Sequence, residues 1–161
     1  ISISKGLTGG FLPMGITLAK ETIFQSFISD SPKKTFWHGH SFTANPLGCA
    51  AANASLDLLE KDPIKYLSFE EKHLSHLKKI EKLPFVKNIR VTGTIAAFDI
   101  EIGKNEGYLN NVGKRIKALS IKKGLFIRPL GNVIYLLPPL CITDNQLEKS
   151  YRIIYEILSD L

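Results

Sequence analysis

The sequence changes character near residue 62, and this change limits the folds open to the chain. Residues 1–62 are rich in Gly, Ser, Thr and His, which favour loops, whereas the rest alternates segments of helical and strand-like periodicity. A chain of 161 residues with 44% hydrophobic content can bury one or two modest cores. We therefore predict two units, residues 1–62 and residues 63–161, the second of them an α+β domain.

A strongly marked helix, NPLGCAAANASLDLLEK, ends the first part. Asn45 is a favourable N-cap, Pro46 suits the first helical position, and Asp62-Pro63 ends the helix. Asp62 can also begin a second helix that ends before Pro84. The expected apolar stripe of this second helix consists of Ile64, Leu67, Leu74, Leu77 and Ile80. We expect the two helices to connect the two units.

Two hairpins are predicted in the second part. FVKNIRV and TIAAFDIEI are separated by Thr92-Gly93, and the second run alternates apolar with polar side chains, which is typical of a half-buried antiparallel strand. Its expected buried residues are Ala96, Phe98, Ile100 and Ile102. LFIRP and VIYLLPP flank a turn at residues 130–132 and predict the second hairpin.

Two further helices are predicted in the second part. The first has an apolar stripe from Leu109 to Leu119 and ends at Gly124. Thr143 and Gln146 have the spacing of a capping box at the start of the last helix. The apolar face of this last helix is expected to consist of Leu147, Tyr151, Ile154 and Leu158.

Composition and charge argue against several classes of function. No apolar run reaches the roughly 20 residues of a bilayer span, and the N-terminus lacks the pattern of a signal peptide. The formal net charge is +6, but the lysines are scattered along helical stretches, so we expect neither a nucleic-acid nor a membrane partner. Cys49 and Cys141 lack metal or redox spacing, which favours a reduced, cytoplasmic compartment and two buried thiols.

Lys5 is the first candidate for chemistry, in the segment ISISKGLTGGFLPMG. A lysine amine acts as a nucleophile when burial or nearby cations favour its neutral form, and it then condenses with the carbonyl group of a substrate or of pyridoxal phosphate. Glycines after a strand end would leave room for a flat cofactor. By spacing alone, however, a lysine at a strand end is most often a surface residue, and the order of a phosphate-binding P-loop is absent.

The stretch TFWHGHSFTANPLGCAAANA is the second candidate. Gly39, Ser41 and Thr43 supply a flexible backbone and hydroxyl groups just before the predicted helix at residue 46. The start of a helix is suited to binding a phosphate group, because its first N–H groups have no internal acceptor. We therefore expect a phosphate-bearing ligand near this segment.

Three segments together resemble the second half of the class III pyridoxal-phosphate aminotransferases, in the same order and spacing. They are SKGLTGGFLPMG, WHGHSFTANPLGCAAANASLDLL and GLFIRPLGNVIYLLPPL. The resemblance covers nearly the whole chain. It implies a fragment of the α/β PLP-transferase fold (fold type I), with the end of the large PLP-binding domain and a connecting helix in residues 1–62 and a small C-terminal α+β domain in residues 63–161.

The resemblance also implies roles for single residues. Lys5 matches the lysine that carries pyridoxal 5'-phosphate and moves the proton between substrate and cofactor. Ser41 matches a hydroxyl residue, usually threonine, that binds the cofactor phosphate of the neighbouring subunit, with Gly39 and His40 beside it. His40 stands where relatives commonly have proline. The implied assembly is a homodimer with shared active sites.

Arg128 and Tyr135 carry the expected contacts to the substrate, together with Gly39. Many class III enzymes that act on amino acids have an arginine just before the Pro-Pro pair, where this chain has Tyr135. Arg128 matches instead an arginine that binds a substrate carboxylate. Within the class, this pattern implies a step of biotin biosynthesis in which the amino group of S-adenosylmethionine is moved to 8-amino-7-oxononanoate. The same pattern occurs among broad amine transaminases, which remain an alternative.

The resemblance further implies that the chain is a C-terminal fragment. The family's phosphate cup, the ring stacked on the cofactor and the aspartate at the pyridine nitrogen all lie upstream of its lysine. None of these is in the chain, so we expect it to be inactive by itself. The second hypothesis is a non-catalytic binding or dimerisation module that has kept the α+β fold.

The four histidines are not expected to bind a metal. His38 and His40 are separated by one residue, and His73 and His76 could share one face of a helix. Neither pair has a third acidic or cysteine ligand nearby. A loop position is expected for the first pair and a solvated helix face for the second.

Overall fold

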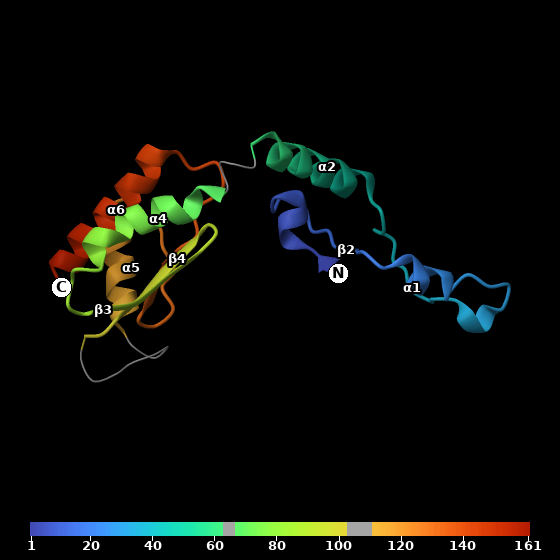
Figure 1. Ribbon diagram of the computed structural model, residues 1–161, viewed down its shortest axis with the longest axis horizontal. Coiled ribbons are helices and arrows are strands. Elements are labelled where there is room, and N and C mark those ends of the chain that lie inside the picture. The colour runs from blue at the N-terminus through green and yellow to red at the C-terminus, as the bar shows by residue number, and fades with distance from the viewer. Residues whose placement is uncertain (63–66, 103–110) are drawn as a thin grey trace. The chain divides into compact units, whose positions relative to one another are not determined.

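The computed structural model describes residues 1–62, 67–102 and 111–161. The chain divides into two compact units, Ile1–Pro63 and Ile64–Leu161, each with its own internal packing (Figure 1). The assignment of these units to a large cofactor domain and a small C-terminal domain remains a prediction.

The first unit consists of short elements joined by loops, followed by one longer helix. Its elements in chain order are β1 (Ser2–Ile3), the 3-10 helix η1 (Lys5–Thr8), β2 (Ile16–Thr17), α1 (Glu21–Gln25), the 3-10 helix η2 (Pro32–Lys34) and α2 (Pro46–Lys61). β1 pairs with β2 in the antiparallel direction. This small ladder holds η1 in the connection between the two strands.

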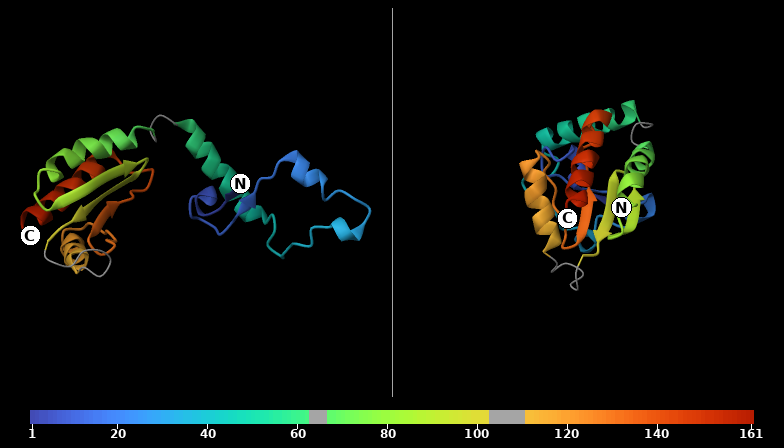
Figure 2. Two further views of the ribbon diagram at one scale, coloured as in Figure 1. Left: turned by 60° about the horizontal axis from the view of Figure 1, so that its bottom comes forward. Right: turned by 90° about the vertical axis from the view of Figure 1, so that its left-hand side faces the viewer.

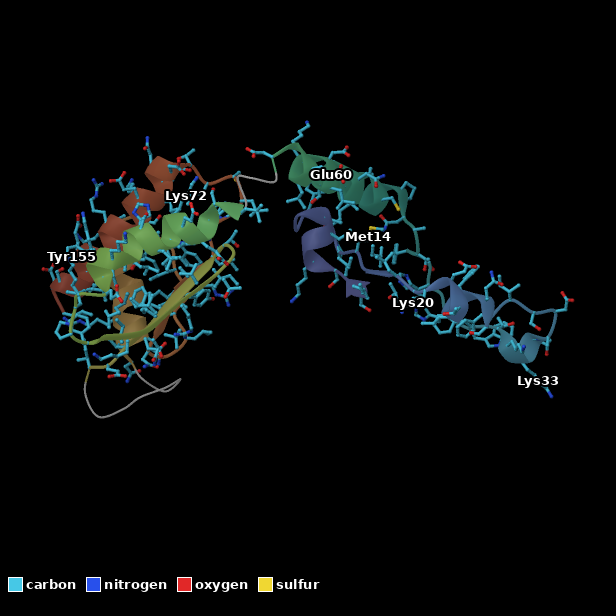
Figure 3. All side chains as sticks on the ribbon, viewed as in Figure 1. Met14, Lys20, Lys33, Glu60, Lys72 and Tyr155 are labelled. Atoms are coloured by element: carbon cyan, nitrogen blue, oxygen red, sulfur yellow. The ribbon has the colours of Figure 1, made fainter. Side chains whose placement is uncertain are left out.

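The helix predicted after Asn45 is confirmed as α2, with both of its expected N-terminal signals. The side-chain oxygen of Asn45 accepts a 2.7 Å hydrogen bond from the Gly48 N–H, and Pro46 occupies the first turn. This bond satisfies one of the N–H groups that a helix start leaves without an internal acceptor. A Cβ at Gly48 would lie 2.9 Å from the Asn45 amide atoms and 3.1 Å from the Met14 sulfur, so the close approach of these residues to α2 requires glycine. Met14 lies beside α2 in Figure 3.

The first unit buries few side chains. Leu7 and Thr8 of η1 and Ala52 of α2 are buried where these two elements pack together. Many large apolar side chains elsewhere in the unit are exposed, and Phe11 and Trp37 are 80% and 81% exposed. Exposed apolar surface of this extent is typical of a face that packs against other protein.

The second unit is an antiparallel sheet covered by helices, which is the α+β arrangement predicted for it. Its described elements are α4 (Phe69–Ile80), β3 (Val86–Thr92), β4 (Ile95–Ile100), α5 (Val112–Lys122), β5 (Val133–Leu136) and α6 (Asp144–Ser159). The strand order is β3-β4-β5, and both pairings are antiparallel. The predicted hairpin around Thr92-Gly93 is confirmed as β3 and β4.

The core of the second unit lies between one face of the sheet and the helices. Alternate residues of the central strand β4, namely Ala96, Phe98 and Ile100, are fully buried, as predicted. They share one apolar cluster with Ile80 of α4 and Ile154 of α6. Figure 2 shows α4 and α6 side by side over the sheet. Burying one such Phe or Ile side chain contributes about 1.5–3 kcal/mol, so this cluster dominates the stability of the unit.

The helix α4 differs from its prediction in part of its buried face and in its role. Its buried side chains are those of Phe69, His73, Leu77 and Ile80, whereas the expected stripe residues Leu67 and Leu74 are exposed. The predicted start of this helix at residues 63–66 lies outside the described residues. Because α4 packs on β3 and β4, it is a layer of the second unit, and the prediction of a second connecting helix is wrong. The prediction is confirmed at Leu77 and Ile80, which are buried, and is wrong towards the start of the helix, where Phe69 and His73 take the core positions.

The second predicted hairpin is wrong in its first strand. Leu130 and Val133 exchange two backbone hydrogen bonds of 3.0 and 2.9 Å, so the expected turn is present. Residues 125–129 nevertheless form no strand. Pro129 has no N–H to donate to a ladder, and β5 pairs with β4 instead.

Smaller corrections concern single side chains. Ile102 lies beyond the end of β4 and is exposed, because the ladder stops at Ile100. Cys49 is half-buried and Cys141 is exposed, so the expectation of two buried thiols is wrong. Leu109, the first residue of the predicted stripe of α5, lies outside the described residues.

The helix α6 begins as predicted. The Thr143 hydroxyl accepts a 3.3 Å hydrogen bond from the Gln146 N–H, and the Gln146 side chain accepts one of 3.0 Å from the Thr143 N–H. This is the expected capping box. The side chains on its predicted apolar face, those of Leu147, Tyr151, Ile154 and Leu158, are all buried. Among the described residues, no helix combines the length and the hydropathy that crossing a bilayer requires.

Candidate functional site

Lys5 lies directly after β1, in an unusual backbone conformation. Its φ of 34° is left-handed, which is unfavourable for a residue with a Cβ. The turn that begins η1 holds it there, since the Leu7 N–H donates a 3.0 Å hydrogen bond to the Ser4 carbonyl. Within the described ranges the exposed Lys5 amine has no hydrogen-bond or ion-pair partner. Residues kept in such conformations are concentrated at functional sites.

Glycines keep the surroundings of Lys5 open. A Cβ at Gly6 or Gly10 would meet no atom within 4 Å. Gly9 and Gly10 have φ values of 62° and 82°, so the turn after η1 depends on residues without a Cβ. The backbone on the C-terminal side of Lys5 is therefore free of close neighbours at positions 6 and 10.

A row of rings precedes α2. The side chains of Phe36, His38, His40 and Phe42 alternate along the chain, and successive ring centroids are 5.7, 6.5 and 6.5 Å apart. Phe27 extends the row, 5.6 Å from Phe36. The rings form one side of a loop that is otherwise rich in small polar residues.

A cavity of about 660 Å³ lies between this row of rings and the segment around β2. Gly39 and His40, two of the predicted cofactor-binding residues, line it. The other lining residues are Pro13, Met14, Gly15, Thr17, Phe36, His38, Phe42, Thr43, Ala44 and Asn45. Aromatic walls with a few polar groups are typical of small-molecule sites.

The loop around Ser41 keeps several hydrogen-bond donors free. His40 Nδ1 accepts a 3.2 Å hydrogen bond from the Phe42 N–H, so in its neutral form the imidazole carries its proton on Nε2. In the part of the chain that the structure describes, this Nε2–H has no acceptor, and neither do the hydroxyl and N–H of Ser41. Three donors in one short loop are suited to an anion.

These groups fit the aldehyde and the phosphate of pyridoxal phosphate. The exposed Lys5 amine matches an aldehyde, and the donors of His40 and Ser41 match a phosphate. The structure brings Gly39 and His40 into one cavity, but neither Lys5 nor Ser41 is among the residues that line it. Lys5 therefore lies in a different part of the unit from the loop of Gly39, His40 and Ser41, and this cavity does not join the two parts.

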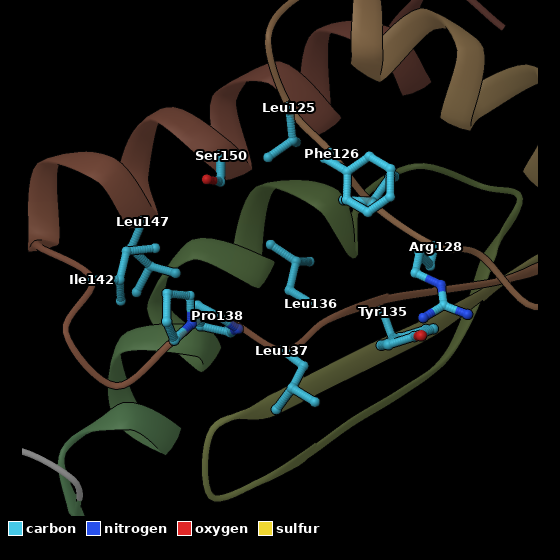
Figure 4. A pocket seen from close by; sticks show the side chains of 12 residues that line it. Leu125, Phe126, Arg128, Tyr135, Leu136, Leu137, Pro138, Ile142, Leu147 and Ser150 are labelled. Atoms are coloured by element: carbon cyan, nitrogen blue, oxygen red, sulfur yellow. The ribbon is translucent and has the colours of Figure 1, made fainter. Parts of the chain in front are cut away.

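The second unit has its own cavity, of about 380 Å³ (Figure 4). Arg128 and Tyr135, the predicted substrate residues, lie at one end, and Ile142 and Leu147 lie at the other. The walls between the two ends are mostly apolar. Arg128 is exposed and has no carboxylate partner among the residues described. A slot of this kind is suited to an alkyl chain that ends in a carboxylate, because a guanidinium can bind both carboxylate oxygens.

Sequence reasoning missed several residues of the two cavities. The rings of Phe36 and Phe42 line the first cavity, and their spacing of two residues around the histidines was the available signal. Phe126 and Leu137 line the second cavity and are 70% and 58% exposed. Each is next to a buried residue, Ile127 or Leu136, so exposed and buried positions alternate there. Apolar side chains on both faces of these short segments hid the pattern.

His73 is not on a solvated helix face, so that prediction is wrong. Its ring is fully buried, with Nε2 3.0 Å from the Thr94 carbonyl and Nδ1 2.6 Å from the Tyr151 hydroxyl. A carbonyl only accepts, so Nε2 carries the proton and Nδ1 accepts from the tyrosine. Burial lowers the pKa of His73, with a smaller opposing effect of the bond to Thr94. The described residues include no group of three or more His, Cys, Asp or Glu side chains placed to hold a metal ion.

Comparison with known proteins gives a consistent result. The profile of the family "Aminotransferase class-III" matches residues 1–158. The adenosylmethionine-8-amino-7-oxononanoate aminotransferases of Synechococcus elongatus and Helicobacter pylori align with 100% of the chain, at 48% and 38% identity. The crystal structure of the protein of the same name from Methanocaldococcus jannaschii matches 99% of the chain with a TM-score of 0.86 and 31% identity.

The match is to one part of these longer proteins. The chain spans 38% of the length of the Synechococcus and Helicobacter relatives and 38% of the Methanocaldococcus chain. Over this part the agreement extends through both units, since the family profile includes the Lys5 segment, the ring-bearing loop and the cavity with Arg128. The chain therefore belongs to the class III aminotransferases, the family of pyridoxal-phosphate transaminases that its sequence resembles.

Proposed function

We propose that this chain is the C-terminal part of an aminotransferase that moves the amino group of S-adenosylmethionine to 8-amino-7-oxononanoate, giving 7,8-diaminononanoate. The names of its relatives support this substrate pair. The activity belongs to the longer protein, because the chain spans only 38% of those relatives. We expect the 161 residues alone to be inactive and the whole protein to be cytoplasmic.

The observation that carries the substrate assignment is the cavity of the second unit. 8-Amino-7-oxononanoate is a chain of methylene groups with a carboxylate at one end and an amino ketone at the other. The apolar walls match the methylene groups, and Arg128, which has no carboxylate partner in the described ranges, matches the carboxylate. Tyr135 lies at the same end and can add a hydroxyl group to this contact.

Lys5 is the proposed catalytic residue. Pyridoxal phosphate, when bound, supplies the electron sink that makes the α-proton of an amino substrate acidic. Lys5 would hold the aldehyde carbon of the cofactor and then move a proton between substrate and cofactor. Its exposed amine and the space beside Gly6 and Gly10 support this role.

Gly39, His40 and Ser41 are the proposed contacts to the cofactor phosphate, and Gly39 also to the substrate. The free donors of His40 and Ser41 support the phosphate contact. In a homodimer this loop would complete the site of the neighbouring subunit. The exposed rings of Phe36 and Phe42 agree with a loop that packs against another chain.

The two units are proposed to be the end of the large cofactor domain, in residues 1–62, and the small C-terminal domain, in residues 63–161. The exposed apolar side chains of the first unit support this, because they suit a segment that packs within a larger domain. The complete apolar cluster of the second unit supports its assignment as a separate domain.

The substrate proposal is tested on the full-length protein that contains this chain. The steady-state constants are measured for 8-amino-7-oxononanoate and for its methyl ester, with wild type and with Arg128→Ala. We expect Arg128→Ala to raise the KM of the acid about 10- to 100-fold while the ester is little affected, since the ester lacks the charge that the guanidinium binds. Arg128→Lys should recover only part of the loss, because an ammonium cannot bind both oxygens.

Arg115→Ala, an exposed arginine of α5, is the matched control and should leave both KM values unchanged. Equal losses for acid and ester with Arg128→Ala would give Arg128 a structural role and contradict the proposal. Absence of turnover of the oxononanoate by wild type would favour a broader amine transaminase, and Tyr135 and Trp37 would then be the next residues to vary.

A further inference from the structure

We propose that Gly113 is a positioning residue for Arg128. The absence of a side chain at Gly113 lets the first turn of α5 approach the segment 129–131, which directly follows Arg128. This inference rests on the proposed contact between Arg128 and a substrate carboxylate.

The contact between Gly113 and the turn is close on two sides. The Gly113 N–H donates a 3.1 Å hydrogen bond to the Gly131 carbonyl. A Cβ at Gly113 would lie 2.1 Å from that carbonyl oxygen and 2.8 Å from the Pro129 Cβ. Because non-bonded carbon atoms prefer separations of about 3.5–4.0 Å, any side chain at position 113 must push the helix and the turn apart by about 1 Å.

The turn cannot yield on its other side without loss. Leu130 and Val133 close it by two backbone hydrogen bonds. The Ile100 N–H donates a 2.9 Å hydrogen bond to the Asn132 carbonyl, and the Asn132 amide donates one of 3.3 Å to the Ile100 carbonyl. The residues after Gly131 are therefore tied to β4, so a push from α5 is transmitted to the residues before it.

Arg128 is the residue that such a displacement would affect. Its neighbour Ile127 is buried, whereas Arg128 itself is exposed at the end of the cavity beside Tyr135 (Figure 4). In the described residues no ion pair holds the guanidinium, so the backbone at residue 128 sets the region that this side chain can reach. A change of about 1 Å in a group that binds substrate can lower the rate by up to about 100-fold.

The stability of Gly113→Ala distinguishes this steric contact from the general effect of helix propensity. Gly113 lies in the second residue position of α5. Replacing glycine by alanine in a helix ordinarily raises stability, because alanine loses less backbone entropy. The steric contact at Gly113 predicts instead that alanine lowers the stability. Lys114→Ala, at the exposed neighbouring position, is the matched control for adding an alanine to this turn.

The experiment uses the full-length holoenzyme with Gly113→Ala, Lys114→Ala, Arg128→Ala and the double variant of Gly113 and Arg128. We expect Gly113→Ala to lower Tm and to raise the KM of the carboxylate acceptor about 10-fold, with the KM of its methyl ester and of the amino donor within twofold of wild type. Lys114→Ala should match wild type. In the Arg128→Ala background, Gly113→Ala should add no further loss for the acid, because the group it positions is already gone.

The outcomes separate the two proposals. An unchanged acid KM in Gly113→Ala, or equal losses for acid and ester, overturns the positioning role while leaving the role of Arg128 intact. A Gly113→Ala effect that persists in full without Arg128 also overturns it. If Arg128→Ala itself does not discriminate acid from ester, the proposed function is contradicted first and the positioning role with it.

A milder second variant covers the case in which Gly113→Ala does not fold. Gly131 has a φ of 63°, so Gly131→Ala strains the backbone of the same turn. It should give the same acid-selective rise in KM, and Gly131→Asn, which tolerates this φ better, should recover part of it. If Gly131→Ala leaves the KM of the acid unchanged, the link between this turn and Arg128 is overturned.

Discussion

His73 Nδ1 lies 2.6 Å from the hydroxyl of Tyr151, between α4 and α6 in the core of the second unit. The other ring nitrogen of His73 donates to the Thr94 carbonyl at 3.0 Å. His76, one turn further along α4, stacks on the Tyr151 ring with 4.9 Å between centroids. The neutral imidazole is therefore fully satisfied inside the core, whereas a protonated one would face the tyrosine oxygen with a second N–H.

The first prediction is that stability falls below about pH 6.5. Burial lowers the pKa of His73 in the folded protein from its ordinary value of 6.5, and burial also lowers that of His76. The unfolded chain then binds more protons than the folded one, so the contribution is present above the unfolded pKa and is lost as the pH falls below it. Each histidine can add a slope of at most about 1.4 kcal/mol per pH unit.

Urea unfolding between pH 8 and pH 5 measures this dependence. His76 is only half-buried, and Glu148 and Asp144 oppose its shift, so His73 should dominate. His76→Gln should retain most of the loss of stability. A free energy of unfolding that does not change between pH 7 and pH 5.5 would contradict the buried neutral state of His73.

The second prediction concerns Tyr151→Phe. The substitution keeps the stacked ring but leaves the buried Nδ1 of His73 without a donor, which should lower the free energy of unfolding by about 1–3 kcal/mol. The substitution should also change how the free energy of unfolding depends on pH, because His73 Nδ1 no longer accepts a hydrogen bond from Tyr151. Tyr155→Phe, on the same helix and 38% exposed, is the control and should be nearly neutral. Equal effects of the two substitutions would argue against the hydrogen bond.

The third prediction is that Lys5→Ala in the full-length protein removes the visible absorbance of the lysine-bound cofactor and abolishes turnover. The amine is the proposed covalent anchor, and its exposed side chain has no partner within the described residues, so the fold should be kept. Lys33→Ala, in the exposed η2, should retain both properties. A Lys5→Ala protein that keeps spectrum and turnover would show that the assignment is wrong. Absorption spectra and circular dichroism provide the two readouts.

The fourth prediction links Ser41 to cofactor binding in a dimer. Ser41→Ala should weaken the affinity for pyridoxal phosphate by about 1.5–3 kcal/mol, the usual contribution of one hydrogen bond to a charged group. Ser31→Ala, an exposed hydroxyl outside the loop, should have no effect. Cofactor titration measures the affinity, and light scattering measures the assembly. A monomeric protein that carries its full complement of cofactor would remove the basis for a shared site.

Local hydrogen bonding made several elements predictable from sequence. The Asn45 cap of α2 and the capping box of Thr143 and Gln146 depend on partners only three residues apart. Such bonds form whenever the segment is helical, whatever surrounds it. The alternation along β4 was visible in the sequence because successive side chains of a strand point to opposite faces, and Ala96, Phe98 and Ile100 share one face. The family could be recognised because its motifs are contiguous.

Tertiary packing decided several features that the periodicity of the sequence could not predict. His73 became a core residue only because Tyr151 and Thr94, 78 and 21 positions away, supply both of its hydrogen-bond partners. Residues 125–129 lost their predicted strand because β4 pairs with β5 and Pro129 cannot join a ladder. The need for glycine at position 113 exists only where α5 meets the turn of Gly131. Satisfied polar groups and close approaches depend on residues that are distant in sequence, and only the folded chain brings these together.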